Sequence, residues 1–599
     1  MTRAESGTMS KLPAAVLALV TVAIVFSSPA PIAEAQSSFT VPNRDPRVDL
    51  RFDRYYDYPQ MVEALRTLER AWPRFLTLRS IGRSYEGRDL WLMVVNNPDT
   101  GPDTSKPAFW VDGNIHGNEI QGVEINLYIV WFLMENYDSL PKVKELVDQR
   151  AFYILPTQNP DGRQYWFENA NTSSSSRSGT RPLDSDNDGR ADEDGYDDLD
   201  DDGNIVSMRK YVPGQGNMKV SPVDPRLMVR VEPGESGDYI SLGSEGIDND
   251  GDGRINEDGP GGYDLNRNWP ADWEPDYIQG GAHWYPFSHP EARAIGDFLR
   301  THTNIAGVQS WHNSGGMILR GPGAASYGGG AGEYSRRDVQ AYDYVGQRGQ
   351  LILPYYRYVV IHSGLYTVYG GFIDYTHDGL GIFSFSNELW SSRQYYNEAW
   401  TEESPVPEEQ RMLFYNDRLG MGAWYVDWHE VEHPQFGTVE VGGWVKYFNR
   451  VTPPFMLQEL CHRNAMFALF HAEQMPLVEM GDVAVERISG DTFRVTATAR
   501  NPRALPTRAD AARINRIGLP DFFSIEGDGV TVQAGGFTTG QFGDELSLVE
   551  RQPARLRIES GISGIGEVTV TWIVTGRGSA TITYQSQKGG TVSTTIDLR

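Results

Sequence analysis

Cysteine is almost absent from this chain of 599 residues, in which Cys461 is the only one. A single cysteine excludes an intrachain disulfide. The fold must therefore be held by its packed core, and bound ions are the other source of stability that the sequence leaves open. A chain of this length is expected to form two or three domains.

Basic residues are also scarce, because 53 Lys and Arg stand against 80 Asp and Glu and give a formal net charge of −27. Such a chain is repelled by phosphate groups, which argues against nucleic acid or an anionic membrane as a partner. The charge does not indicate any particular chemistry, and it leaves the oligomeric state open.

Long apolar runs are missing except at residues 12–26. Arg3 and Lys11 precede this run, and Ala33-Glu34-Ala35 follows it as a small-x-small cleavage pattern, which predicts a secretory signal at residues 1–35. The run is short for a membrane span, and no later stretch is long and apolar enough to be one. We therefore expect a soluble mature protein that is secreted or periplasmic.

The most informative stretch is residues 113–122, Gly-Asn-Ile-His-Gly-Asn-Glu-Ile-Gln-Gly. An apolar run at residues 109–111 predicts a strand before it, and residues 120–135 predict a buried helix after it. His116 and Glu119 would then lie where a strand passes into a helix, the edge of an α/β sheet at which ligands collect. A histidine and a carboxylate can hold Zn²⁺ from such a loop, although this spacing alone also fits an ordinary surface histidine.

Further segments follow in a recognisable order. They are Asn159-Pro160-Asp161-Gly162, Asp264-Leu265-Asn266-Arg267-Asn268-Trp269, a strand at residues 307–313 that contains His312, and an alternating strand at residues 382–389 that contains Glu388. With the motif around His116, they resemble the metallocarboxypeptidases, the carboxypeptidase A-like zinc exopeptidases. The resemblance covers roughly residues 50 to 475.

The resemblance implies a zinc site. His116, Glu119 and His312 would be the three ligands, a number that leaves one position open as in catalytic zinc sites. Asp264 would orient His116 through the other ring nitrogen. Glu388 would be the general base, and Arg209 would polarise the scissile carbonyl.

The resemblance also implies a substrate clamp. Asn266 and Arg267 would hold the C-terminal carboxylate of the substrate, for which a planar guanidinium is suited. Tyr366, four residues before the Gly370-Gly371 pair, would close over it, and Ile373 would form the floor of the specificity pocket. An apolar residue there favours a large apolar C-terminal residue.

Residues 169–262 interrupt the family pattern with an Asp/Gly-rich insertion. Residues 184–195 and 248–259 are two copies of one repeat, and residues 198–203 are a partial third copy. Acids at positions 1, 3 and 5 with Gly at position 6 predict calcium loops, although Gly at position 12 excludes EF-hands. The alternative is a solvated acidic loop. The predicted calcium ligands are Asp184, Asp186, Asp188, Asp192, Asp194, Asp198, Asp200, Asp202, Asp248, Asp250, Asp252, Asn256 and Asp258.

A second possible zinc motif, His429-Glu430-Val431-Glu432-His433, would require a continuing helix. Pro434 follows directly and disfavours a helix at His433. We interpret the segment as a surface turn.

We therefore predict an α/β catalytic domain at residues 36–476, with a mixed, mostly parallel sheet flanked by helices. After Pro476 the apolar pattern changes to period two, which predicts an all-β sandwich-like domain at residues 477–599. That domain could be a stabiliser, a wall of the substrate approach or an attachment module.

The predicted function is that of a secreted zinc carboxypeptidase with bound Ca²⁺, acting on peptides and proteins with a free C-terminus. One alternative is a related zinc hydrolase of cell-wall or γ-glutamyl peptides. The other is a catalytically inactive, calcium-dependent binding protein.

Overall fold

A computed structural model describes residues 45–325, 334–391, 407–448, 450–539 and 545–599. The predicted signal at residues 1–35 lies outside these ranges. Within them, no helix has both the length and the apolar character needed to cross a membrane.

The first domain is built on an eight-stranded sheet. Its order is β1 (Leu76–Arg83), β2 (Asp89–Val95), β4 (Ala151–Leu155), β3 (Ala108–Gly113), β9 (Ile305–Asn313), β12 (Phe383–Leu389), β10 (Met317–Arg320) and β11 (Arg357–Val360). The pairs β4–β3, β3–β9, β9–β12 and β10–β11 are parallel, and the other three are antiparallel. Every residue of β3, β4 and β9 is buried, as expected for strands covered on both faces.

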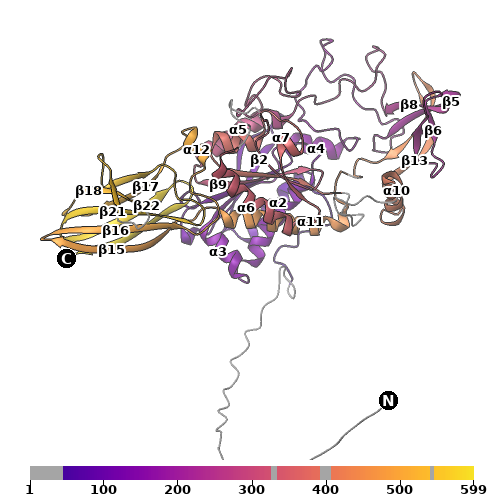
Figure 1. Ribbon diagram of the computed structural model, residues 1–599. Coiled ribbons are helices and arrows are strands. Elements are labelled where there is room, and N and C mark those ends of the chain that lie inside the picture. Colours follow the sequence, from indigo (N-terminus) through magenta and orange to yellow (C-terminus); the bar gives the residue numbers. More distant parts are fainter. Residues whose placement is uncertain (1–44, 326–333, 392–406, 449, 540–544) are drawn as a thin grey trace, which may run out of the picture. The chain divides into compact units, whose positions relative to one another are not determined.

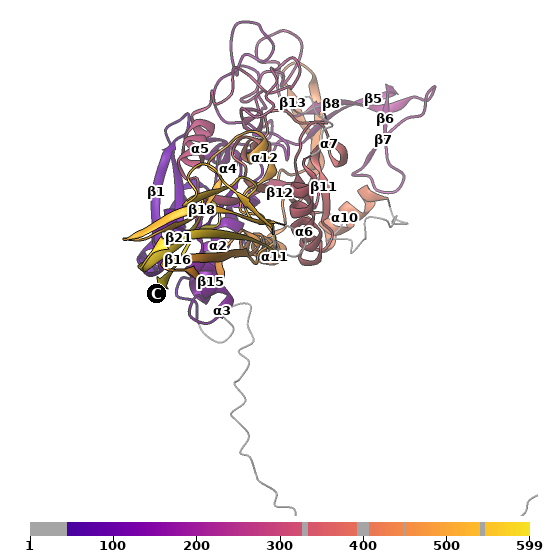
Figure 2. The ribbon, with the colours of Figure 1, turned by 60° about the vertical axis from the view of Figure 1, so that its left-hand side comes forward.

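Helices cover both faces of this sheet. On one face, a single apolar core joins α1 (Tyr58–Ala71), α2 (Gln121–Asn136), α3 (Pro141–Gln149), α6 (Arg336–Ile352) and α11 (Pro454–Gln474). Helices α2, α6 and α11 lie side by side there (Figure 1, Figure 2). On the other face lie α5 (Pro290–Thr301) and the segments that carry Trp269 and Phe372. The predicted α/β architecture is confirmed.

The insertion at residues 169–262 contains more regular structure than its composition suggested. Strands β5 (Ser207–Gly216), β6 (Met218–Val220), β7 (Met228–Arg230) and β8 (Gly237–Ser244) join β13 (Tyr425–His433) and β14 (Gly437–Trp444) in a six-stranded sheet. Of these strands, β5, β6, β8 and β13 are labelled in Figure 1. The surface turn predicted at His429–His433 is therefore wrong. The segment is a strand, and its pairing with β14 satisfies the backbone groups without any helix.

The C-terminal region is all-β, as predicted. One sheet has the order β15 (Glu479–Ser489), β16 (Thr492–Asn501), β21 (Gly566–Gly576), β18 (Val530–Thr539) and β19 (Glu545–Leu548). The other has the order β20 (Arg555–Ile558), β17 (Asp521–Glu526), β22 (Gly578–Ser586) and β23 (Gly590–Leu598). One apolar core containing Val495, Phe523, Trp572 and Tyr584 lies between the two sheets.

A buried charged cluster joins this region to the catalytic domain. The two carboxylate oxygens of Asp338 accept the backbone N–H groups of Asp510 and Ala511 at 2.9 Å, at the start of α12 (Asp510–Ile514). His377, in the π-helical segment η5 (Tyr375–Gly379), lies between two carboxylates. Its Nδ1 is 2.9 Å from Asp378 and its Nε2 is 3.6 Å from Asp338.

This cluster makes the stability of the fold depend on pH. Burial alone would lower the pKa of His377, but the carboxylates of Asp378 and Asp338 outweigh it and raise the pKa to about 9. The unfolded value is about 6.5. The stabilising contribution is therefore complete below about pH 6.5 and is lost as the pH rises through about 9.

We predict that His377→Asn removes stability on the order of 3 kcal/mol at about pH 6.5 and little above about pH 9.5, so that its Tm depends less on pH than that of the wild type. Thermal unfolding across this range is the measurement. His471→Asn is the matched control, because His471 is also buried but has its pKa lowered to about 3 by burial and stays neutral throughout. Parallel pH profiles for His377→Asn and the wild type would contradict the charged cluster.

Candidate active site

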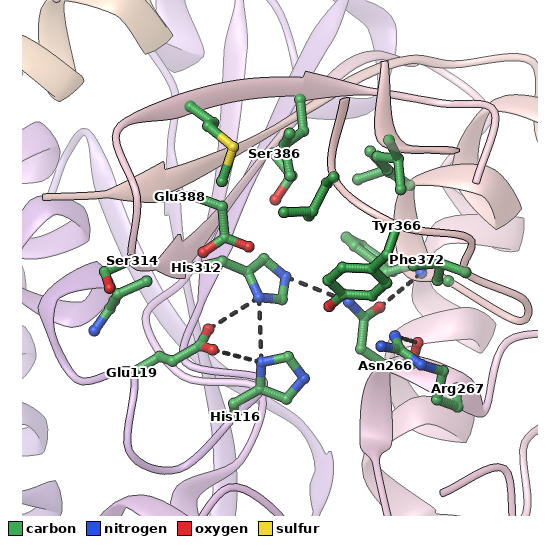
Figure 3. Close-up of a pocket in the computed structure, with 18 of the residues that line it drawn as sticks. His116, Glu119, Asn266, Arg267, His312, Ser314, Tyr366, Phe372, Ser386 and Glu388 are labelled. Atoms are coloured by element: carbon green, nitrogen blue, oxygen red, sulfur yellow. Dashed lines mark hydrogen bonds and ion pairs between the residues drawn. The ribbon is translucent and has the colours of Figure 1, made fainter. Parts of the chain in front are cut away.

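Three of the predicted metal ligands meet at the carboxyl edge of the central sheet. His116 and Glu119 lie between β3 and α2, and His312 lies near the end of the neighbouring parallel strand β9. His116 Nδ1 is 2.9 Å from Glu119 Oε1, His312 Nδ1 is 2.9 Å from Glu119 Oε2, and the two Nδ1 atoms are 3.2 Å apart (Figure 3). All three side chains are buried.

The loop that presents His116 depends on two neighbours. Asn114 adopts a left-handed backbone conformation (φ 55°), and its side-chain amide donates to the carbonyls of His116 and Gly117 at 2.7 and 3.1 Å. A side chain at position 117 would meet the carbonyl oxygen of Ser176 at 2.4 Å, so only glycine fits there. The loop is thus folded back on its own backbone.

Asp264 contacts the ring nitrogen of His116 that does not face Glu119. Its Oδ1 lies 2.9 Å from His116 Nε2, as a group that orients a metal-bound histidine should. Burial opposes the charge on this carboxylate, but Arg267, His116 and Arg177 hold its pKa well below the usual range.

These donors fit a zinc ion. If the Nε2–H group of neutral His116 donates a hydrogen bond to Asp264, the Nδ1 lone pair faces a carboxylate oxygen at 2.9 Å. Two acceptors at that distance repel each other unless a cation lies between them. Two imidazole nitrogens and a carboxylate are a donor set that Zn²⁺ prefers.

The predicted clamp residues line the same pocket. Asn266 and Arg267 lie in the 3₁₀ turn η3 (Leu265–Arg267), where Asn266 Oδ1 accepts the Phe372 N–H at 2.9 Å. Tyr366 is half exposed at the pocket mouth, between α7 (Ile361–Gly364) and α8 (Phe372–Asp374). Figure 3 shows Tyr366, Asn266 and Arg267 together on one side of the zinc ligands.

Glu388 is paired with His312 in the register of β12 and β9, and its carboxylate points into the pocket (Figure 3). Burial and the charge of Glu119 raise its pKa to about 7, although His312, Arg177 and Arg450 act in the opposite direction. Glu388 thus lies beside the predicted zinc ligands, where a general base would have to be.

The family model described as zinc carboxypeptidase matches residues 61–198 and 240–412, just over half of the sequence. The chain belongs to the zinc carboxypeptidase family. A second model, for a domain of unknown function (DUF8731), matches residues 477–597.

Individual relatives are similar over shorter stretches. Carboxypeptidase D of Rattus norvegicus is 34% identical over 140 residues, which are 23% of this chain and 10% of that protein. A zinc carboxypeptidase of Saccharothrix mutabilis subsp. capreolus is 31% identical over 138 residues, 22% of this chain and 32% of that protein. The alignments thus span a third or less of these relatives' lengths.

Among solved structures, carboxypeptidase A of Helicoverpa armigera is similar with a TM-score of 0.43 and 17% identity, over 72% of this chain and 76% of that chain. Thrombin activatable fibrinolysis inhibitor is similar with a TM-score of 0.44 and 16% identity, over 72% and 76%.

The placement of Arg209 corrects a prediction made from the sequence. Arg209 lies on β5, where it pairs with Glu440 and stacks between the rings of Trp428 and Tyr239, at 4.0 and 4.3 Å from their centroids. It is absent from the pocket lining, which in the described residues contains Arg177 and Arg450 besides the predicted clamp residue Arg267. The Arg-Lys pair had drawn attention to it, but that pair belongs to the inserted sheet of this zinc carboxypeptidase family member.

Arg177, unlike Arg209, lines the pocket beside the predicted zinc ligands. Its guanidinium contacts Glu119 Oε1 at 3.1 Å and Asp264 Oδ2 at 3.2 Å, and its backbone carbonyl accepts the Gly117 N–H. It lies in a Ser-rich run, Ser173–Ser176 followed by Arg177 and Ser178, which has no motif of its own. Only the proximity of this run to the first acidic repeat could have drawn attention to it.

The pocket ends in an apolar compartment. It is lined by Met317, Leu319, Ile361, Leu365, Val368, Phe372 and the predicted floor residue Ile373. Asp374 also lines it, and its Oδ1 accepts the Gly323 N–H at 3.0 Å. Burial, and to a lesser extent the charge of Asp378, raises the pKa of Asp374 to about 7.

The two acidic repeats pack against each other as a pair. The backbone N–H groups and carbonyls of Asp194 and Asp258 exchange hydrogen bonds at 3.2 Å. Some groups of three carboxylates lie close enough together to hold one metal ion and draw on both repeats. They are Asp186 with Glu193 and Asp258, Asp188 with Glu193 and Asp250, and Asp186 with Asp252 and Glu257. Glu193 and Glu257, at position 10 of each repeat, were not among the predicted ligands.

Other predicted calcium ligands have different partners. Asp192 accepts the Leu183 N–H at 3.4 Å, and the Asn256 amide donates to the carbonyls of Ser244 and Glu245. In the partial copy, Asp198 and Asp202 accept backbone N–H groups, while Asp200 pairs with His429 at 2.8 Å. Asp184 and Asp248 accept N–H groups within their own loops, and Asp184 also lies within ligand distance of Asp186 and Asp188.

We predict that Arg177→Ala lowers kcat on a peptide with a free C-terminus by about 10²–10³, the cost of removing one oxyanion donor. Arg209→Ala should leave kcat within about threefold of the wild type, because its contacts lie on the inserted sheet. Steady-state kinetics of both variants, with zinc content measured in parallel, is the test. The reverse ranking would restore Arg209 to the site.

Proposed function

We propose that this protein is a zinc-dependent exopeptidase that removes the C-terminal residue from peptides and proteins. The observation that carries the proposal is one pocket in which the three zinc donors, Glu388 and the Asn266–Arg267 pair meet beside an apolar compartment. The family membership supports it, because the pocket residues from His116 to Glu388 lie within the matched ranges.

Substrate binding would begin at the clamp. A C-terminal carboxylate placed at Arg267 can accept two parallel N–H groups, and Asn266 offers a further amide. The Arg267 Nε atom is buried without a hydrogen-bond partner in the structure, so a donor is available there. The side chain of the last residue would enter the apolar compartment above Ile373, which favours large apolar residues.

The reaction would then use groups around the zinc donors. Zn²⁺ held by His116, Glu119 and His312 would supply Lewis acidity. Glu388 would accept a proton from the attacking water and pass it to the leaving amine. Arg177 would face the scissile carbonyl and stabilise the negative charge that develops on its oxygen.

Two other functions compete with this proposal. A zinc hydrolase of cell-wall or γ-glutamyl peptides would share the zinc donors, but the Asn266–Arg267 clamp favours an ordinary free C-terminus. An inactive, calcium-dependent binding protein would not need Glu388 in the pocket. Export to a secreted or periplasmic location remains part of the proposal and is supported by the pattern of residues 1–35.

We predict that peptides ending in Phe or Leu lose one residue, and that C-terminal amidation removes most of kcat/KM. Arg267→Ala should cause a comparable loss on the free acids, because an unpaired buried charge costs about 2–5 kcal/mol. Mass spectrometry of paired free and amidated peptides measures both.

Equal cleavage of the two forms indicates an endopeptidase or amidase, and a preference for C-terminal Lys or Arg contradicts the apolar floor. Glu388→Gln is the matched control. We expect this variant to bind zinc normally and to lose nearly all activity.

We also propose that the paired repeats bind Ca²⁺ through ligands from both copies. Asp194 is fully buried, and among the described residues its Oδ2 has no hydrogen-bond donor. Buried oxygens of Glu193 and Glu257 also lack a donor there. Burial together with neighbouring carboxylates raises the pKa of both Glu193 and Glu257 to about 7. A divalent cation would relieve this repulsion, and carboxylate oxygens are the ligands that Ca²⁺ prefers.

We predict that chelation of Ca²⁺, with zinc held saturating, lowers the Tm by several degrees and raises KM, because Asp264 lies six residues after Asp258. Glu193→Gln should weaken binding to both repeats in a calcium titration, since its carboxylate approaches acids from each copy. Asp201→Asn is the control, with the same loss of charge in the partial third copy. Unchanged Tm and kinetics after chelation would leave the repeats as a solvated acidic loop.

A further inference from the structure

Arg450 is a residue of the pocket that the family pattern does not account for. It lies between β14 and α11, beyond the ranges matched by the zinc carboxypeptidase model, yet it lines the pocket beside Glu119 and Asn313. Its Nη2 atom is 3.2 Å from the Asn313 carbonyl oxygen and 3.4 Å from Glu119 Oε1.

The chain holds this arginine in place by its neighbours. Thr452 N donates to Gln121 Oε1 on α2 at 2.6 Å, and Tyr55 donates to the Thr452 carbonyl at 2.6 Å. Val451 is buried with Ile120 and Trp166. Because the backbone directly after Arg450 is fixed, less conformational entropy is lost when this arginine binds a ligand.

Arg450 lies on the opposite side of the zinc donors from the clamp. Figure 3 shows Ser314, which follows the Asn313 that Arg450 contacts, across the pocket from Tyr366 and Asn266. A peptide with its C-terminus at Arg267 and its scissile bond at the zinc donors must continue toward Ser314. Arg450 would therefore face the residues that precede the scissile bond.

The charge of Arg450 is only partly satisfied. Among the described residues, Glu119 supplies the carboxylate within 4 Å of its guanidinium, and the Glu119 oxygens also contact His116, His312 and Arg177. Within the part of the chain that the structure describes, the Arg450 Nε is buried without a hydrogen-bond partner, and its side chain is 26% exposed. Zinc ligation would occupy Glu119 and leave the guanidinium free for another anion.

We propose that Arg450 selects substrates with an acidic side chain at one of the two residues preceding the scissile bond. A carboxylate there could accept two N–H groups of the guanidinium, which a glutamine or lysine side chain cannot do equally well. The proposal rests on the proposed carboxypeptidase function and adds a second determinant to it, remote from the apolar compartment.

The test compares peptides that end in the same Phe and differ only in Glu, Gln or Lys at each of the two preceding positions. For the wild type we expect kcat/KM about 10-fold or more higher for Glu than for Gln at one of them, the range of a charge-assisted hydrogen bond. Arg450→Gln should bring this ratio to about one, and Arg450→Lys should keep part of it. Arg209→Gln is the control and should keep the wild-type ratio, with Tm and zinc content checked for every variant.

Two results would overturn the role of Arg450 while leaving the carboxypeptidase function intact. One is a wild-type ratio near one at both positions, and the other is a folded, zinc-loaded Arg450→Gln that keeps the wild-type ratio. If the wild type cleaves no peptide with a free C-terminus, the proposed function fails, and the substrate role of Arg450 fails with it.

Discussion

The pocket depends on one buried carboxylate. Glu119 lies within 3.4 Å of His116, His312, Arg177 and Arg450, so four cationic or metal-binding side chains converge on two oxygen atoms. Burial opposes its charge, but the two histidines hold its pKa well below the usual range. Each partner comes from a different part of the chain, and the central sheet, the insertion and the loop before α11 are therefore fixed relative to one another at this point. A change at Glu119 would leave several charges unpaired at once.

The insertion is part of this arrangement. Arg177 stands seven residues before the first acidic repeat, and the second repeat leads within six residues to Asp264, which contacts both His116 and Arg177. Tyr263 reinforces the same closure, because its carbonyl accepts from Ser178 and its hydroxyl accepts the Arg181 N–H. The pairing of Asp194 with Asp258 thus brings Arg177, near the start of the insertion, close to Asp264, which lies just after its end. Cations bound between the repeats would therefore affect the pocket through the backbone segments that carry Arg177 and Asp264.

The sequence was most informative where a residue is fixed by a local pattern. His116, Glu119, Asn266 and Glu388 each stand at a strand end or turn that is readable from neighbouring residues, and the structure brings them together. Arg177 was missed because its place is set by its own distant contact with Gly117 and by that of Ser178 with Tyr263, which no local pattern records. Arg209 was misassigned because an Arg-Lys pair on an inserted strand resembles a loop motif. Arg450 reaches the pocket only through tertiary folding, and Glu193 becomes a candidate ligand only when the second repeat lies beside it.

The sequence left three roles open for the C-terminal domain: a stabiliser, a wall of the substrate approach or an attachment module. Its contacts favour the role of a stabiliser of the catalytic domain. Ala509 and Ala512 belong to the apolar core of the catalytic domain, and Asp338 joins the start of α12 to His377. His377 follows Ile373 and Asp374 by one helical turn, so the wall of the apolar compartment and the domain contact share one short segment. Lys588, whose pKa burial lowers to about 7, donates to the Ile305 carbonyl at the start of β9. The C-terminal domain can therefore influence substrate binding from outside the pocket, because the segment that it contacts includes Ile373, the predicted floor for the substrate's last side chain.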